Sequence, residues 1–271
     1  MKDFAGHLHL EAAPRAGGRT VLAKQSFRAP FHLGKSYWDA GVLQVRVVNA
    51  TAGILAGDRL ELAVRIQAGA ALLVMTPAAT RAYMMRSGAA ECRQTFAVES
   101  GGWLEYAPEP LFPHRDSDYT QTTRLEAAAG AEVYYADALA PGRATRGETW
   151  AWHDLRLSLD VFHGGDRVLR ERLAGAGAAL GRRAAFFGTP QAWFGTVIAL
   201  SSKLDDVAGL PERLAAGVGA GVCLGATRLR RGGWIVRVVA PEGQALRDAL
   251  AGVRAVFAGH LPQLATNLRR L

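Results

Sequence analysis

The sequence predicts a mostly β protein: a β-helix-like scaffold of stacked β-layers, built from strand–turn–strand repeats and with about two α-helices near the C-terminus. Apolar and polar residues alternate in short runs, as in residues 60–66, which gives one face of a strand an apolar surface. Glycine turns then recur roughly every thirty residues, a period typical of units that stack and bury a shared core. Helical spacing is found mainly late in the chain.

Four strand–turn–strand units follow one another, and the spacing indicates that each is hairpin-like. The first has an alternating run at 60–66, a turn at 68–70 and an apolar run at 71–75. The other three are 94–98 and 103–106 around a turn at 99–102, 120–126 and 133–136 around Gly130, and 155–161 and 168–169 around a turn at 163–166.

Two helices are expected near the C-terminus. Apolar residues at i, i+3, i+4 and i+7 predict an amphipathic helix over about 242–258, and a shorter helix is expected to begin at Pro211. The apolar residues of the longer helix are Leu246, Ala249, Leu250, Val253 and Phe257. Segment 173–188, rich in Ala and Gly, is interpreted as a loop or weak helix that orders on partner binding.

Length and composition restrict the class of protein. The 271 residues and 49% hydrophobic content fit one domain over 1–271. The sequence shows no signal core or membrane span, so we expect a cytoplasmic protein. Cys92 and Cys223 lie in strand-like segments and are expected to be buried thiols. The net charge is +8 with scattered arginines, which favours an acidic protein partner over nucleic acid.

Motifs for catalysis are lacking in the sequence. Residues 34–36 read Gly-Lys-Ser, but a phosphate-binding loop requires a glycine where this chain has Ala29. Hydrolase and zinc-binding patterns are also lacking, so we predict no catalytic residue and no tightly bound metal. Asp116 and Asp118 are expected to share a strand face beside His114, and a second shared face is expected for His7 and His9.

Carboxylates are the candidates for handling a divalent ion, because such ions favour oxygen and nitrogen ligands. Asp58 and Glu61 lie three residues apart, across a turn and the start of a strand. The side chain of an Asp after Gly commonly closes a turn by accepting hydrogen bonds from backbone N–H groups, and Glu61 falls on the polar face of its strand. From the residues alone, these ordinary roles are favoured over an acidic site, and both interpretations stay open.

Five ordered blocks resemble the UreD (UreH) family of urease accessory proteins. Residues 52–60, for example, read Ala-Gly-Ile-Leu-Ala-Gly-Asp-Arg-Leu, similar to the family's Gly-Gly-[Ile/Leu]-x-x-Gly-Asp-x-Leu. The other blocks are residues 76–83, 104–110, 141–148 and 166–173. The residues that match the family's motifs are Gly53, Gly57, Thr76, Thr80, Arg81, Tyr83, Gly142, Arg143 and Gly147. The chain departs from the family's pattern at Ala52, at Met84 and Met85, and in the tail 267–271, and at the motif position Arg81 it has arginine where the family usually has lysine.

The resemblance implies a role in nickel insertion into apo-urease, in a complex with UreF and the GTPase UreG. It implies that the chain does no chemistry and has no cofactor of its own, because Ni²⁺ is transient and GTP is bound by UreG. It also implies a water-filled passage lined by acidic residues. Asp58 and Glu61 are the best-matched candidates for that lining, followed by Asp137, Glu148 and Glu171.

Two other functions compete with this interpretation. One is a stand-alone carbohydrate- or polyanion-binding β-module that uses arginines and four exposed tryptophans. These tryptophans are Trp38, Trp103, Trp150 and Trp152. The other is a β-solenoid hydrolase with Asp116 and Asp118 as paired acids, which is disfavoured because neighbours on one strand do not flank a cleft.

Overall fold

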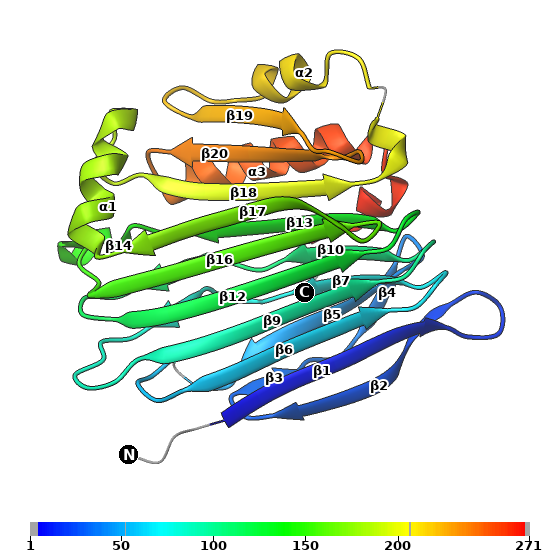
Figure 1. Ribbon diagram of the computed structural model, residues 1–271, viewed down its shortest axis with the longest axis horizontal. Helices are drawn as coiled ribbons and strands as arrows, with labels where there is room; N and C mark the ends of the chain where they lie inside the picture. The colour runs from blue at the N-terminus through cyan, green and yellow to red at the C-terminus, as the bar shows by residue number, and fades with distance from the viewer. Residues whose placement is uncertain (1–4, 52, 206, 269–271) are drawn as a thin grey trace.

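The computed structural model describes residues 5–51, 53–205 and 207–268. Ala52 and the last three residues of the tail therefore lie outside the described residues. Within the described part, the strands form two large sheets that face each other and one two-stranded ribbon. Figure 1 looks onto the first of these, here called the front sheet, with the back sheet behind it and extending above it.

The front sheet has seven strands in the described residues, in the order β17-β16-β12-β9-β6-β1-β2. Their bounds are β1 (Ala5–Pro14), β2 (Thr20–Arg28), β6 (Arg59–Ile66), β9 (Ala90–Val98), β12 (Asp118–Ala127), β16 (Asp154–His163) and β17 (Asp166–Gly175). The polar residues of these strands mostly point to solvent and the apolar residues point toward the back sheet, as the alternating sequence predicts.

The back sheet follows the path β19-β20-β18-β13-β10-β7-β5-β3. Its strands are β3 (Phe31–Leu33), β5 (Val42–Asn49), β7 (Ala71–Met75), β10 (Trp103–Ala107), β13 (Glu132–Leu139), β18 (Trp193–Leu200), β19 (Cys223–Arg228) and β20 (Trp234–Ala240). Short strands β4 (Tyr37–Asp39), β8 (Thr80–Ala82) and β11 (Leu111–Pro113) pair at its margin, and β14 (Gly142–Arg143) pairs with β15 (Glu148–Thr149).

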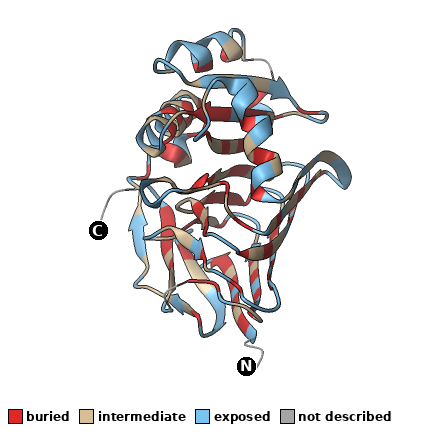
Figure 2. Ribbon diagram, turned by 90° about the vertical axis from the view of Figure 1, so that its left-hand side faces the viewer, coloured by how far each residue is buried: buried red, intermediate tan, exposed pale blue. Residues whose placement is uncertain are grey.

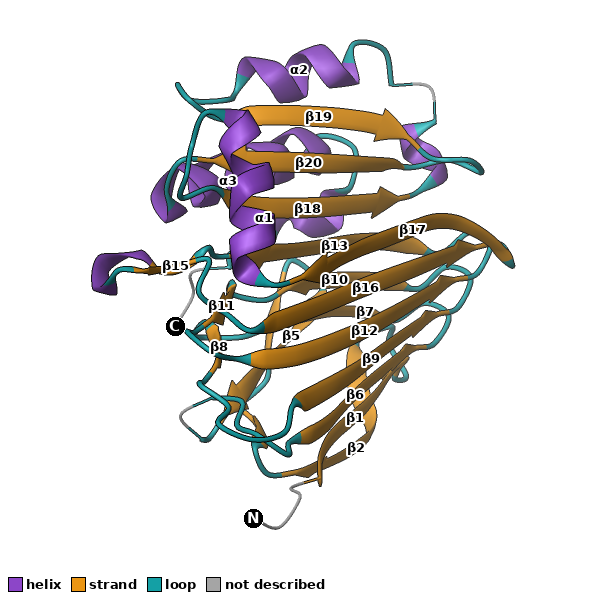
Figure 3. Cartoon of the chain, turned by 60° about the vertical axis from the view of Figure 1, so that its left-hand side comes forward, coloured by secondary structure: helices purple, strands orange, loops and turns teal. Residues whose placement is uncertain are grey.

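The two helices expected late in the chain are confirmed as α2 (Leu210–Ala216) and α3 (Gly243–Ala258). Segment 173–188, predicted as a loop or weak helix, contains the end of β17, then α1 (Gly177–Ala184) and the 3₁₀ turn η2 (Ala185–Phe187). Other 3₁₀ turns are η1 (Ala144–Arg146), η3 (Ser202–Leu204) and η4 (Pro262–Ala265). Figure 3 shows the helices gathered around β18, β20 and β19. Among the described residues, no helix is both long and apolar enough to cross a membrane.

The repeat is solenoid-like, and the hairpin-like pairing predicted for the units is wrong for the first three. In the first unit β6 joins the front sheet and β7 the back sheet, and each pairs in parallel with the equivalent strand of the next unit. The same parallel pairing links β9 to β12 and β10 to β13. The fourth unit is a true antiparallel hairpin of β16 and β17.

Glycine turns carry the chain from the front sheet to the back sheet. Gly69, Gly101 and Gly130 have φ values of 75°, 74° and 80°, a region that residues with a Cβ rarely adopt. The turns also bond to one another: the Gly69 N–H donates to the Gly101 carbonyl (3.2 Å) and the Gly101 N–H to the Gly130 carbonyl (2.9 Å). Each turn therefore holds the next unit in register.

Apolar side chains form separate layers on the two faces of the back sheet. One layer lies between the sheets and includes Phe96, Leu125 and Tyr135, and the other lies under α3 and includes Tyr134 and Phe257. Because side chains alternate along a strand, neighbours in β13 belong to different layers. Figure 2 shows the buried residues running along the strands and on the sheet-facing side of the helices.

A buried ion pair attaches α3 to the back sheet. The Glu105 side chain is fully buried and the Arg254 side chain is 16% exposed. Arg254 donates from Nε to Glu105 Oε1 (2.7 Å) and from Nη2 to Oε2 (3.1 Å), and it also donates to Thr266 Oγ1 (2.7 Å). Burial raises the pKa of Glu105, and the Arg254 guanidinium opposes that shift. One arginine thus connects β10, α3 and the segment after η4.

Replacing Arg254 by Met leaves the Glu105 carboxylate buried without its cation, so we expect the free energy of unfolding to fall by about 3 kcal/mol. Arg247→Met is the matched control, because Arg247 lies on the same helix but makes an exposed 3.6 Å contact with Glu109. The control should lose less than about 1 kcal/mol. Urea denaturation followed by circular dichroism measures both variants, and equal losses would contradict this role of Arg254.

Candidate functional site

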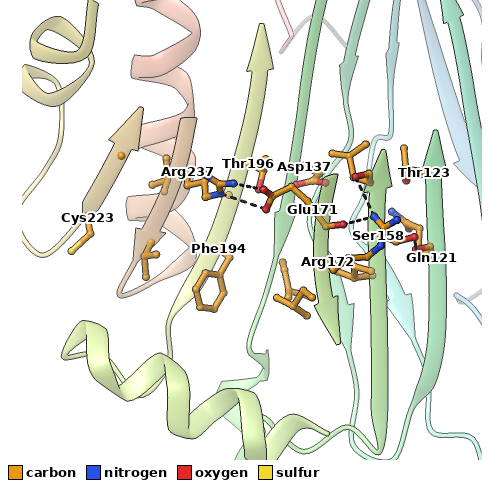
Figure 4. Close-up of a pocket in the computed structure, with 18 of the residues that line it drawn as sticks. Gln121, Thr123, Asp137, Ser158, Glu171, Arg172, Phe194, Thr196, Cys223 and Arg237 are labelled. Atoms are coloured by element: carbon orange, nitrogen blue, oxygen red, sulfur yellow. Dashed lines mark hydrogen bonds and ion pairs between the residues drawn. The ribbon is translucent and has the colours of Figure 1, made fainter. Parts of the chain in front are cut away.

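A cavity of about 550 Å³ lies where the front sheet ends at β17 and the back sheet continues into β18, β20 and β19. We call it the carboxylate cavity. Its polar lining includes Asp137, Glu171, Thr196, Arg237 and the rim residue Cys223. Figure 4 shows Glu171 and Arg237 pointing toward one another across it.

Strand register places these side chains side by side. Across the back sheet, Asp137 of β13 pairs with Thr196 of β18, which pairs with Arg237 of β20. Across the front sheet, Thr123 of β12 is in register with Leu159 of β16, which is paired with Glu171 of β17. Because both rows face the space between the sheets, residues from distant parts of the sequence line one cavity.

Asp137 is a half-buried carboxylate in the wall of the carboxylate cavity. Burial raises its pKa to about 6, although the hydrogen bond from the Tyr135 hydroxyl (3.1 Å) lowers it, and the charge of Glu171 raises it further. Within the described residues no ion pair involves Asp137. This carboxylate is therefore close to its titration range near neutral pH, which is common at functional sites.

Glu171 is held by the guanidinium of Arg237, which reaches across from the back sheet. Arg237 donates from Nε to Glu171 Oε2 (3.4 Å), and its Nη2 forms a shorter bond to Oε1. The side chains are 48% exposed for Arg237 and 32% exposed for Glu171. This ion pair is thus in contact with solvent at the mouth of the cavity.

A second cavity of about 250 Å³, the motif cavity, is lined by motif residues Gly53, Thr76, Thr80 and Arg81. Gln121 lines both cavities. It is part of a set of polar side chains between the sheets. In this set Thr123 Oγ1 donates to Gln94 Oε1 (3.1 Å), and the Tyr119 hydroxyl donates to Gln121 Oε1 (3.0 Å). Polar side chains therefore extend from one cavity to the other.

Several motif residues are required by close backbone packing. A Cβ at Gly53 would overlap the Arg81 carbonyl and the Tyr83 ring, and the Arg81 carbonyl accepts a 2.7 Å hydrogen bond from Ile54 N. The block around residue 53 therefore packs directly on the block that contains Arg81.

The block at residues 141–148 is held by an ion pair. Arg143 donates to both oxygens of Glu148, from Nε (2.8 Å) and Nη2 (2.6 Å). These bonds lower the pKa of Glu148. A Cβ at Gly142 would also overlap the Glu148 carbonyl. Both carboxylate oxygens of Glu148 are thus already occupied by its own loop.

The structure places Asp58 and Glu61 away from the carboxylate cavity. Asp58 is 8% exposed, its Oδ2 accepts the Leu55 N–H at 2.8 Å, and burial raises its pKa. These contacts fit closure of the turn. Glu61 lies exposed on the outer face of the front sheet, 3.4 Å from His9 Nε2. A role of either residue in metal passage stays a prediction.

Three expectations from the sequence are wrong. Asp116 lies in a turn with φ of 57° and Asp118 begins β12, so the two do not share a strand face. Cys92 is buried as predicted, but Cys223 is exposed on the edge strand β19.

The surface of exposed tryptophans expected for a carbohydrate- or polyanion-binding module is not formed. Three of its four tryptophans are almost fully buried: Trp103 (2% exposed), Trp150 (8%) and Trp152 (3%). The shared face of His7 and His9 is confirmed, with ring centroids 4.8 Å apart.

Sequence reasoning missed Arg237, Gln94 and Thr123 as site residues. A signal existed for the last two, because each is a polar residue at an inward position of a strand whose other inward positions are mostly apolar. Arg237 gave no such signal, since arginines occur throughout the chain. Among the described residues, no three His, Cys, Asp or Glu side chains are grouped so that they could hold a metal ion.

Comparisons with known proteins agree with the resemblance. A family model described as UreD urease accessory protein matches residues 5–271. The urease accessory protein UreD of Opitutus terrae is 47% identical over 278 aligned positions, covering 99% of this chain and all of that protein. UreD of Yersinia pseudotuberculosis is 35% identical over 175 positions, which cover 63% of this chain and 52% of that protein. A Yersinia pestis relative gives the same identity over 60% of its length.

Asp137→Asn should stabilise the protein at pH 7.5 more than at pH 5. The folded-state pKa of about 6 is above the ordinary value, so the stability contribution of Asp137 is complete at low pH and is lost as pH rises through 6. Asn keeps an acceptor for the Tyr135 hydroxyl but is never charged. Thermal unfolding at the two pH values measures the effect.

Asp160→Asn is the control, because its effect on stability at pH 7.5 should have the opposite sign. Burial opposes ionisation of Asp160, but bonds from Arg172 and Arg170 lower its pKa overall. Its stability contribution is present above its unfolded pKa, so this variant should lose stability at pH 7.5. A pH-independent effect of Asp137→Asn would show that its carboxylate is not strained by burial.

Proposed function

The chain belongs to the UreD family of urease accessory proteins, and on this premise we propose that it is a non-catalytic scaffold through which nickel reaches apo-urease. In this proposal it acts in the cytoplasm, in a complex with UreF and the GTPase UreG, and UreG alone binds and hydrolyses GTP. Nickel is the cargo of the chain and not its cofactor.

The observation that carries the proposal is the pair of carboxylates in one cavity. Asp137 and Glu171 line the carboxylate cavity from opposite sheets, and the charge of one raises the pKa of the other. A divalent cation between them would relieve this repulsion and receive oxygen ligands. Among the described residues, these two carboxylates are not grouped with a third His, Cys, Asp or Glu that could complete a metal site, so the ion can leave again.

The polar side chains between the sheets indicate the route that the ion would take. Gln121 lines both cavities, Thr123 lies two residues along the same strand β12, and Gln94 of the neighbouring strand β9 is in register with Thr123. Neutral oxygens of this kind stabilise a hydrated cation without holding it. We infer that the route runs between the motif cavity and the carboxylate cavity, with a partner protein at each mouth.

A surface for one such partner lies beside the carboxylate cavity. Phe186 is 91% exposed and Phe187 is 50% exposed, and Phe187 also lines the cavity. Exposed neighbouring phenylalanines are typical of protein contacts. Within the described residues, Arg182 and Arg183 on the adjoining helix α1 make no ion pair, which favours an acidic partner surface.

Asp137→Asn and Glu171→Gln should each lower the nickel content of urease, by roughly tenfold, when they replace the natural chain in cells that express urease and its accessory proteins. Metal analysis of purified urease measures nickel per active site. Co-elution with UreF shows in each case that the variant is folded.

Asp160→Asn is the comparator for this experiment. It removes a carboxylate charge that does not line the carboxylate cavity, so we expect near-normal nickel loading. Asp58→Asn separates the two interpretations of Asp58, because its amide oxygen would still accept the backbone N–H that closes the turn. Near-normal loading would assign Asp58 to the turn, and reduced loading would add it to the route. Full loading with the double variant of Asp137 and Glu171 would refute the proposed route.

Replacing Phe186 and Phe187 by Ser should abolish one of two complexes, the one with UreF or the one with apo-urease, and leave the other intact. The physical reason is that each mouth of the route has its own partner. Size-exclusion chromatography at micromolar concentration tests both complexes. Phe27→Ser, on the edge strand β2, is the matched control, because Phe27 is also exposed (41%) but remote in the strand order. Retention of both complexes would contradict this assignment of the surface.

A further inference from the structure

Arg237 occupies the position of a cation in the carboxylate cavity. Its guanidinium contacts both carboxylate oxygens of Glu171, which is the bidentate arrangement that arginine favours. Asp137 lies in the same transverse row of the back sheet, two strands away from Arg237. The cavity lining therefore contains two carboxylates and two arginines. Arg172 is paired with Asp160, and Arg237 is the arginine that pairs with a carboxylate of the cavity, Glu171.

The pair of Arg237 and Glu171 is suited to opening. Both side chains are partly exposed to solvent, so their attraction is screened and the pair contributes little to stability. The two residues also come from different sheets, β17 and β20, which are not hydrogen-bonded to each other. Arg237 can thus swing away from Glu171 without breaking a strand ladder.

We propose that Arg237 is the resident counter-ion of the Asp137 and Glu171 site, a gating residue that a divalent cation must displace before it binds. This inference rests on the proposed function, in which the same cavity passes nickel. The guanidinium neutralises the charge of Glu171 in the empty site and lowers the affinity of the site for the ion. Glu171 becomes a ligand when Arg237 leaves, and the returning guanidinium helps to release the ion to the next site.

If Arg237 is a gate, replacing its side chain should strengthen the binding of Ni²⁺. Removal of the competing charge in Arg237→Gln should tighten Ni²⁺ binding to the purified chain about tenfold, measured by equilibrium dialysis against nickel chloride. Arg237→Lys should remain near the natural affinity, because lysine keeps the positive charge although it loses the bidentate contact. The double variant Arg237→Gln, Glu171→Gln should lose the gain, since the freed carboxylate is then missing.

Arg124→Gln is the matched control. Arg124 also pairs with a carboxylate, Glu126, but on the outer face of the front sheet. Its removal frees an isolated carboxylate and should leave the Ni²⁺ affinity unchanged. An unchanged affinity in Arg237→Gln, or a gain that survives Glu171→Gln, would overturn the inference.

Nickel loading of urease separates this inference from the proposed function. If Arg237 is a gate, Arg237→Gln binds Ni²⁺ more tightly and yet loads urease less, because the ion is retained. Tighter binding together with normal loading would overturn the gate. Normal loading with the chain that lacks both cavity carboxylates would instead overturn the route, whatever the binding measurements give.

Discussion

The stacking of glycine turns is the constraint on which the rest of the structure depends. Gly69, Gly101 and Gly130 have positive φ values and bond to one another through their backbones, so each unit enters the back sheet at the same level as the one before it. With a common register, the position of a residue along its strand decides which transverse row it joins. This is why Asp137 and Glu171, on different units and different sheets, line one cavity.

The common register also divides the interior into a dry half and a polar half. Inward residues near the turns, such as Phe96 and Leu125, are apolar and fully buried, whereas Gln94 and Thr123 lie farther from the turns. Polar groups between sheets weaken a core unless they are bonded, and here they bond mainly to each other. Asp137 also accepts a hydrogen bond, from the Tyr135 hydroxyl, but burial still raises the pKa of its carboxyl group. The dry half and the helices on the back sheet supply the stability that such a residue lowers.

The local sequence pattern was sufficient to predict the strands and helices, but not which strands pair with one another. Alternation identified the strands, the glycines identified the turns, and i, i+3, i+4 spacing identified α3. The pattern of a strand does not show whether it pairs with the next strand or with its equivalent one unit later, and the hairpin prediction failed for that reason. Nor does it show that Trp103 faces the helix layer, or that Cys223 lies on an edge strand. Asp58 matched a motif, but its contacts are those of a turn, whereas the contact of Glu171 with Arg237 arises from register alone.

The chemistry of the interior favours oxygen ligands over sulfur. Cys92 lines the motif cavity, but burial raises the pKa of its thiol to about 11, so it stays protonated near neutral pH. A protonated thiol is a poor metal ligand, and a soft thiolate would retain nickel more strongly than carboxylates do. In the proposed route Glu171 and Asp137 supply harder oxygen ligands, and Glu171 is already engaged by the guanidinium of Arg237. Burial therefore weakens metal binding by both Cys92 and Asp137. It keeps the thiol of Cys92 neutral, and it raises the pKa of Asp137 toward neutral pH. A cation held in this way exchanges its ligands readily, which is what passage requires and storage does not.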